Sequence, residues 1–143
     1  MPVRVLLADD SPAFLVAVGE SLTMSDGVEV VGTALDGDTA VALASATRPD
    51  VAVIDVEMPG GGPALAARLV AQVPGIRVLC LTGRDDERTV LTMIMAGATG
   101  FVVKGSLEED LGAYVRRCAS GVRFVVAGCS DAVRARIAAL PST

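Results

Sequence analysis

The stretch VAVIDVEMPGGGP, residues 51–63, decides how this 143-residue chain folds. Four apolar residues run into Asp55, and three consecutive glycines precede Pro63. A short, mostly β-branched run that ends in turn residues predicts a strand buried on both faces, as in a parallel sheet. Asp55 then stands at the carboxyl end of the strand, where open α/β sheets place their chemistry. Its carboxylate could serve as a metal ligand, a nucleophile or a cap for the helix that follows.

The sequence on both sides of this stretch alternates between apolar runs and capped helical segments. Capping residues, prolines and glycines mark where the helices begin and end. The expected strands are 3–8, 28–34, 51–55, 76–81 and 101–103, and the expected helices are 12–25, 38–47, 63–73, 86–96 and 106–120. Five βα units in succession predict an α/β fold: a flavodoxin-like, doubly wound, five-stranded parallel sheet in the order 2-1-3-4-5, with helices on both faces.

Composition limits the class of protein. The length predicts one domain, and 52% hydrophobic with 3% aromatic residues means a core of aliphatic side chains. Because no apolar run approaches the ~18 residues of a membrane span, we expect a soluble, cytoplasmic chain without a membrane partner. The three cysteines are widely spaced, which predicts reduced, packed thiols. The chain has no histidine, so histidine-based metal sites and catalytic triads are excluded.

Charge is distributed unevenly along the chain. Residues 1–110 carry 7 basic and 16 acidic side chains, whereas residues 111–143 carry 5 basic and 1 acidic. An acidic body argues against direct binding to nucleic acid. The scattered arginines near the C-terminus indicate a solvated helix surface.

Polar side chains follow the carboxyl ends of four expected strands. They are the pair Asp9 and Asp10, then Asp55, Thr82 and Lys104. Strands one and three are neighbours in the expected order, so the three carboxylates should meet, with Glu57 close by. Two carboxylates ~5 Å apart at an effective dielectric constant of ~20 repel by roughly 3 kcal/mol. Such a cluster either takes up a proton or holds a cation.

The donor set favours one cation and one kind of chemistry. All the ligand atoms are oxygens, which suit Mg²⁺ better than zinc. Thr82 offers a hydroxyl group and Lys104 a mobile positive charge. Together these groups predict a site for a phosphoryl group on Asp55. The alternative is that all of them are unrelated turn residues, which the repeated placement at strand ends disfavours.

In combination these motifs resemble the receiver domain of two-component response regulators, over residues 3–121. The resemblance is carried by the acidic pair, the DxxMPG-type turn at 55–60, Thr82 followed by a small residue, and GFVVKG at 100–105. It implies that Asp55 accepts a phosphoryl group from a sensor histidine kinase. It also implies that Asp10, Asp55 and the backbone carbonyl of Glu57 hold Mg²⁺, with Asp9 acting through water.

The same resemblance assigns roles to three further residues. Lys104 and Thr82 would bind the phosphoryl oxygens, and Phe101 would be an aromatic switch that turns inward when Thr82 moves. A plain core position is the other interpretation of Phe101. One departure from the family is Gly105, which stands where many receivers carry a cis-forming proline. The glycines at 60–62 lack the spacing of a dinucleotide site and are expected to serve positive φ and close backbone approach.

The last part of the sequence, residues 122–143, is expected to be an extension of the receiver at 1–121. Residues 122–126 are apolar and extended, and Ser130 can cap a helix to residue 140, with Val133, Ile137 and Leu140 on one stripe. This arrangement resembles the stretch that leads to a helix-turn-helix effector in the LuxR/NarL-type subfamily. The sequence contains no such effector, so DNA would be reached only through a domain absent from it. We expect the stripe to cover the fifth helix or a partner's, with a possible homodimer contact there.

Two other functions fit parts of the pattern. A Mg²⁺-dependent phosphatase of the haloacid dehalogenase type also uses an aspartate after a strand, but it resembles this chain less, since Glu57 stands where a second aspartate belongs. A degenerate receiver acting as an interaction module is the other alternative. A receiver is not an enzyme beyond its own phosphorylation and dephosphorylation.

Glu57 and Arg84 flank the mouth of the expected site, and we predict that their pairing tunes dephosphorylation.

Overall fold

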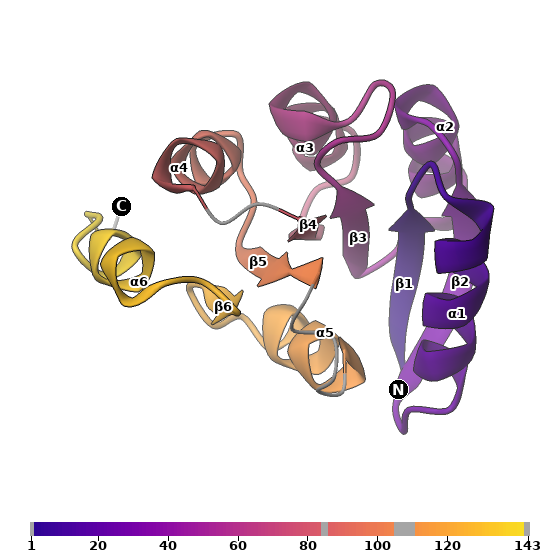
Figure 1. The fold of residues 1–143 in the computed structure, drawn as a ribbon. Coiled ribbons are helices and arrows are strands. Elements are labelled where there is room, and N and C mark those ends of the chain that lie inside the picture. Colours follow the sequence, from indigo (N-terminus) through magenta and orange to yellow (C-terminus); the bar gives the residue numbers. More distant parts are fainter. Residues whose placement is uncertain (1, 84–85, 105–110, 142–143) are drawn as a thin grey trace.

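The computed structural model describes residues 2–83, 86–104 and 111–141, which form one parallel sheet flanked by helices (Figure 1). The strands are β1 (Val3–Ala8), β2 (Val28–Ala34), β3 (Val51–Asp55), β4 (Arg77–Thr82), β5 (Gly100–Val103) and β6 (Val125–Ala127). The helices are α1 (Pro12–Thr23), α2 (Gly37–Thr47), α3 (Gly62–Gln72), α4 (Glu87–Met95), α5 (Leu111–Ala119) and α6 (Asp131–Ala138). Among these helices none is long and apolar enough to cross a lipid bilayer.

The sheet confirms the flavodoxin-like prediction and adds one strand to it. The observed order is β2-β1-β3-β4-β5-β6, with every neighbouring pair parallel. The expected count of five strands was therefore wrong by one. β6 pairs with β5 because the N–H of Val125 donates to the carbonyl oxygen of Thr99 at 2.9 Å and the strands then stay in register. An open β5 edge would leave backbone groups unpaired, and a three-residue strand is enough to cover them.

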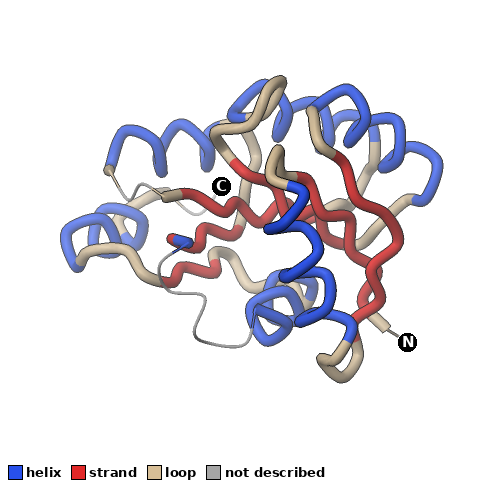
Figure 2. Tube along the Cα trace, turned by 45° about the vertical axis from the view of Figure 1, so that its right-hand side comes forward, coloured by secondary structure: helices blue, strands red, loops and turns tan. Residues whose placement is uncertain are grey.

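Helices cover both faces of the sheet, as Figure 2 shows. Alternate strand residues point to opposite faces and build two separate apolar cores. One core packs Leu6, Ile54, Cys80 and Phe101 of the strands against α2, α3, α4 and α6. The other packs Leu7, Val53, Leu81 and Val102 against α1 and α5. The three cysteines are buried and free, as their spacing predicted; they are Cys80, Cys118 and Cys129.

Local sequence explains where the helices begin. Side chains of Ser11, Asp36, Asp86 and Ser130 each accept the backbone N–H three residues further on. Such caps satisfy donors that the first helical turn leaves unpaired. The capping box predicted at 106–109 lies outside the described residues.

The C-terminal helix packs differently from the expectation. Val133 and Ile137 are buried in the core on the α4 face, whereas the fifth helix packs on the opposite face of the sheet. The stripe packs, as predicted, but on the α4 face rather than on the fifth helix, so that part of the prediction was wrong. A contact with a partner stays a prediction. The reason is topological: β6 extends the sheet, and the chain leaves it on the face that α5 does not occupy. Arg136 of α6 also pairs with Glu87 of α4 at 2.9 Å, on the surface.

Candidate functional site

The carboxyl ends of β1 and β3 bring three carboxylates together. Asp9 and Asp55 are buried, with 2% and 5% of their surface exposed, while Asp10 is exposed to solvent. One carboxylate oxygen from each residue lies within 4.8 Å of the others. The cluster predicted from the strand ends therefore exists, and its open side is the side of Asp10.

Backbone hydrogen bonds at the strand ends fix this geometry. The N–H of Asp9 donates to the carbonyl oxygen of Ala34 at 3.0 Å, so β1 stays paired with β2 up to the acidic pair. The N–H of Val56 donates to the carbonyl oxygen of Leu81 at 3.0 Å and does the same for β3 and β4. The acidic side chains thus extend from rigid elements.

Lys104 enters the cluster from the end of β5. Its Nζ donates a hydrogen bond to Asp9 Oδ2 at 2.9 Å and lies 3.6 Å from Asp55 Oδ2. The other oxygen of Asp9 accepts the N–H of Ser11 at 2.9 Å. One ammonium group therefore faces both buried carboxylates, and it offsets part of their mutual repulsion.

The electrostatics of the site differ between its acid and its base. Burial raises the pKa of Asp55; the N–H of Glu57 and the charge of Lys104 act against this rise, and the charges of Asp9 and Asp10 add to it. Partial burial acts to lower the pKa of Lys104, but its hydrogen bond to Asp9 and the charges of Asp55 and Asp9 outweigh this effect and raise it. Added positive charge would therefore stabilise the ionised form of Asp55, whereas Lys104 stays protonated and charged.

Comparison with known proteins identifies the family of this chain. Residues 5–116 match the response regulator receiver domain family. The chain belongs to that family. A probable transcriptional regulatory protein NarL of Mycobacterium tuberculosis (strain ATCC 25618 / H37Rv) is 37% identical over 141 residues, which are 95% of this chain and 65% of that protein.

Two solved structures agree with this assignment. The signal receiver domain of the putative NarL from Mycobacterium tuberculosis has a TM-score of 0.80 and 38% identity, and the match covers 85% of this chain and 98% of that one. A LuxR-family response regulator from Aurantimonas sp. SI85-9A1 has a TM-score of 0.84 and 28% identity, with 96% of each chain covered. The chain is a receiver domain of the kind found in NarL/LuxR-type regulators, and this favours the receiver over the haloacid dehalogenase alternative. It spans less than two thirds of the NarL protein that it matches.

Two further residues of the receiver motif lie in β4 and β5. Thr82 is the last residue of β4 and is fully buried, next to Leu81, which pairs with Asp55 across the sheet. Phe101 is 2% exposed and packs in the core beneath α4. A core position thus describes Phe101 in this conformation, and its role as a switch stays a prediction.

The loop after Asp55 is shaped by its glycines. Gly60 and Gly62 have positive φ, of 70° and 73°. A Cβ at Gly61 would lie 2.9 Å from the carbonyl oxygens of Asp55 and Met58. Both expected uses of the glycines, positive φ and close approach, are therefore confirmed.

The structure tests the predictions for Glu57 and Arg84 only in part. The N–H of Glu57 donates to Asp55 Oδ1 at 3.2 Å, and its side chain is exposed. The proposed role of its carbonyl as a metal ligand stays a prediction. Arg84 lies outside the described residues, so the predicted pairing with Glu57 is untested.

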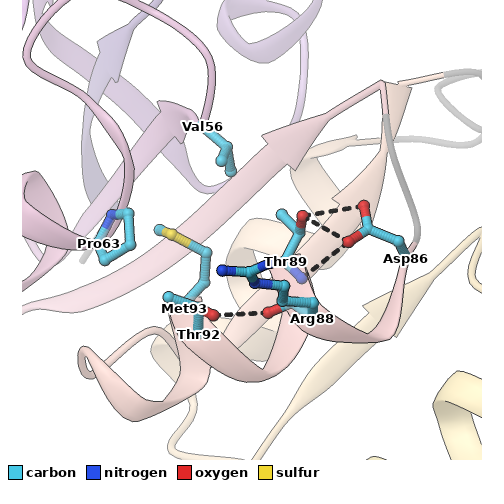
Figure 3. Close-up of a pocket in the computed structure, with 7 residues that line it drawn as sticks. All are labelled: Val56, Pro63, Asp86, Arg88, Thr89, Thr92 and Met93. Atoms are coloured by element: carbon cyan, nitrogen blue, oxygen red, sulfur yellow. Dashed lines mark hydrogen bonds between the residues drawn. The ribbon is translucent and has the colours of Figure 1, made fainter.

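A hollow of about 450 Å³ lies beside the receiver site, between the loop after β3 and the first turns of α4 (Figure 3). Val56 and Pro63 form one wall, and Met93 reaches toward them from α4. Asp86 accepts hydrogen bonds from the backbone N–H and the hydroxyl of Thr89 at the helix start. The hydroxyl of Thr92 donates to the carbonyl oxygen of Arg88, and none of the three clustered carboxylates lines the hollow.

One contact at the site was not predicted from the sequence. The ring of Phe14, in the first turn of α1, lies with its centroid 4.5 Å from Lys104 Nζ. Its position three residues after the Ser11 cap was visible in the sequence. That it faces the end of β5 follows only from the packing of α1 against the sheet.

Proposed function

We propose that this receiver accepts a phosphoryl group on Asp55 in a Mg²⁺-dependent reaction. The observation that carries the proposal is the position of Asp55, a buried carboxylate 3.6 Å from Lys104 Nζ and within 4.8 Å of the acidic pair. Asp9, the other buried carboxylate, already accepts hydrogen bonds on both oxygens, from Lys104 and from the N–H of Ser11. Burial raises the pKa of Asp55, so a cation bound beside it would stabilise its ionised form.

The acidic cluster has the donor set that Mg²⁺ prefers. Asp10 and Asp55 offer carboxylate oxygens, and the exposed side of the cluster leaves space for water and phosphate ligands. The Glu57 carbonyl is a third proposed ligand, and Asp9, held by Lys104 and Ser11, would act through water. Bound there, Mg²⁺ supplies positive charge to the carboxylates and to the phosphoryl oxygens.

The residues of the chain divide the reaction between them. An oxygen of Asp55 attacks the phosphorus atom of the donor, and the bond from phosphorus to the donor's leaving group breaks, with its electron pair going to that group. Lys104 and the Thr82 hydroxyl bind phosphoryl oxygens as charge gathers on them. For a sensor histidine kinase the leaving group is the imidazole of its phosphohistidine. We propose no other reaction for the chain.

The assignment is tested by labelling with acetyl phosphate. Wild-type protein should become phosphorylated in the presence of Mg²⁺ and not after chelation of the metal. The label should vanish in Asp55→Asn and be strongly reduced in Asp10→Asn. Arg68→Ala is the matched control, because its exposed ion pair with Asp38 is not part of the acidic cluster. Undiminished labelling of Asp55→Asn would end the proposal.

We infer the wider role from the relatives. NarL and the LuxR-family regulator are named as transcriptional or response regulators. The phosphorylated receiver would therefore control transcription, with DNA contacted by an effector domain rather than by residues 1–121. A sensor kinase is the partner upstream, and a homodimer contact through α5 or the extension at 122–143 is a further proposal. Chemical crosslinking with and without phosphorylation tests the dimer.

A further inference from the structure

An aromatic ring touches the ammonium group that faces the phosphoacceptor. Lys104 Nζ lies 4.5 Å from the centroid of Phe14, 2.9 Å from Asp9 and 3.6 Å from Asp55. A cation within about 6 Å of a ring centroid, over its face, is attracted by the electron density of the ring. The ring and the two carboxylates therefore hold one ammonium group between them.

Two hydrogen bonds fix the backbone of the turn that carries the ring. Asp9 Oδ1 accepts the N–H of Ser11 at 2.9 Å, and Ser11 Oγ accepts the N–H of Phe14 at 3.2 Å. Pro12 opens the helix between them, with its φ set by its own ring. Phe14 is half-buried and packs against the core shared by α1 and α5. The ring is thus held by the same turn that holds Asp9.

Lys104 needs such support more than most side chains do. It sits just beyond the last residue of β5, and 29% of its side chain is exposed. A lysine side chain is long and flexible. Its ammonium group is a point charge, so attraction to a carboxylate sets the distance between the two groups but not the direction of approach. A ring face adds an apolar surface and a preferred direction of approach at once.

We propose that Phe14 is a positioning residue for Lys104. Its ring holds the ammonium between Asp9 and Asp55, where it meets the phosphoryl group as that group arrives. The inference rests on the proposed function. With acetyl phosphate, an Asp55 oxygen bonds to phosphorus, the phosphorus–oxygen bond to acetate breaks, and acetate leaves with the electron pair. The ammonium held by Phe14 offsets the negative charge on the phosphoryl oxygens during this step.

The contact itself is measured first, without any phosphodonor. Lys104 is the only lysine of the sequence, so protein labelled with ¹³C-lysine gives one set of ε-methylene signals. A ring face shifts nearby protons upfield. We expect upfield ε-proton signals in the wild type and signals near random-coil positions in Phe14→Leu. Equal signals in the two proteins would overturn the proposal, whatever the outcome of labelling.

The functional test uses the rate of labelling by acetyl phosphate with Mg²⁺. Phe14→Leu keeps an apolar side chain but removes the ring, and it should slow labelling roughly five-fold, within the range of measured cation–ring attractions. Phenylalanines carrying one, two or three fluorines at position 14 keep the shape while the ring face loses electron density. The rate should fall stepwise along this series. A flat fluorine series would show that the ring only fills space, and would overturn the proposal.

Phe124 is the matched control. Its ring lies 4.9 Å from the guanidinium carbon of Arg123. Phe124 directly precedes β6, at the amino end of that strand, whereas the acidic cluster lies at the carboxyl ends of β1 and β3. The same fluorine series at Phe124 should leave the labelling rate unchanged. A fall as large as that at Phe14 would also overturn the proposal, because the effect would then be one of stability. If wild-type protein takes up no label at Asp55, the proposed function fails, and the lysine signals still decide the contact.

Discussion

Two parts of this receiver use burial in opposite ways. At the carboxyl ends of β1 and β3 the sheet buries two carboxylates, Asp9 and Asp55, which share one ammonium group. At the other edge, β6 and α6 bury Val125, Val133 and Ile137 among apolar neighbours. Burying charge costs free energy unless it is paired, whereas burying aliphatic side chains stabilises the fold. The comparison indicates that β6 and α6 stabilise the fold, whereas the buried carboxylates of the site destabilise it.

The largest expected effect comes from removing the stabilising part. A chain ended after Gly121 loses β6 and α6, and with them three buried aliphatic side chains worth about 1.5–3 kcal/mol each. The entropy regained by the missing residues offsets part of this. We expect a loss of roughly 3–5 kcal/mol and a Tm lower by about 10–20 °C, measured by thermal unfolding.

A shorter truncation is the control for that experiment. A chain ended after Pro141 keeps the hydrogen bonds from Arg123 to the carbonyl oxygens of Leu140 and Pro141. It should unfold like the full chain. If the chain ended after Gly121 keeps the full stability, then β6 and α6 are a passive linker and the comparison fails.

The second effect concerns the acidic cluster. Binding of a cation there should raise the free energy of unfolding. At a Mg²⁺ concentration of 100 times Kd, binding to the folded state alone adds about 2.7 kcal/mol to the free energy of unfolding. Asp10→Asn removes an exposed carboxylate of the cluster, so its stability without Mg²⁺ should match that of the wild type while most of the gain with Mg²⁺ disappears. Urea unfolding with and without the metal measures both. An equal gain in the two proteins would place Mg²⁺ elsewhere.

The smallest effect concerns the ion pair between the extension and α4. Arg136 and Glu87 are both more than half exposed, and such pairs contribute about 0–1 kcal/mol. Arg136→Ala should therefore lower the Tm by no more than about 4 °C, and high salt should remove the difference from the wild type. A loss as large as that of the truncated chain would mean that charge, rather than apolar burial, holds α6.

Much of this arrangement could be predicted from the sequence, for a physical reason. Parallel strands bring their carboxyl ends to one edge, so polar residues after apolar runs find one another without any knowledge of side-chain packing. This placed Asp55, Thr82 and Lys104 correctly. It failed for β6, because a three-residue strand has too few residues to show a period, and its pairing depends on the open edge of β5.

Contacts between distant side chains could not be predicted in the same way. Phe14 and Lys104 are ninety positions apart, and their approach depends on how α1 packs across the sheet. An aromatic residue in an amphipathic helix is usually a core residue, so nothing in its own neighbourhood marked Phe14. The face of the sheet on which α6 packs could not be predicted either, because it depends on β6, which the sequence pattern did not reveal.

Ionisation of Asp55 links the two halves of the comparison. Its pKa is raised in the folded protein from 3.8, so folding favours the protonated form. The stability that this carboxyl contributes is then fully present below pH 3.8 and is lost as the pH rises through the raised pKa. At pH 7 without Mg²⁺ the ionised group opposes folding, and the neutral amide of Asp55→Asn does not carry this cost.

The most direct test is a pair of measurements on Asp55→Asn. At pH 7 without Mg²⁺ it should be more stable to urea than the wild type, with a difference that shrinks as the pH falls through the pKa of Asp55. The same protein should take up no label from acetyl phosphate when Mg²⁺ is present. Greater stability together with lost labelling would show that the site gives up stability for phosphoryl chemistry. A variant that is less stable than the wild type, or that is labelled as well, would contradict that account.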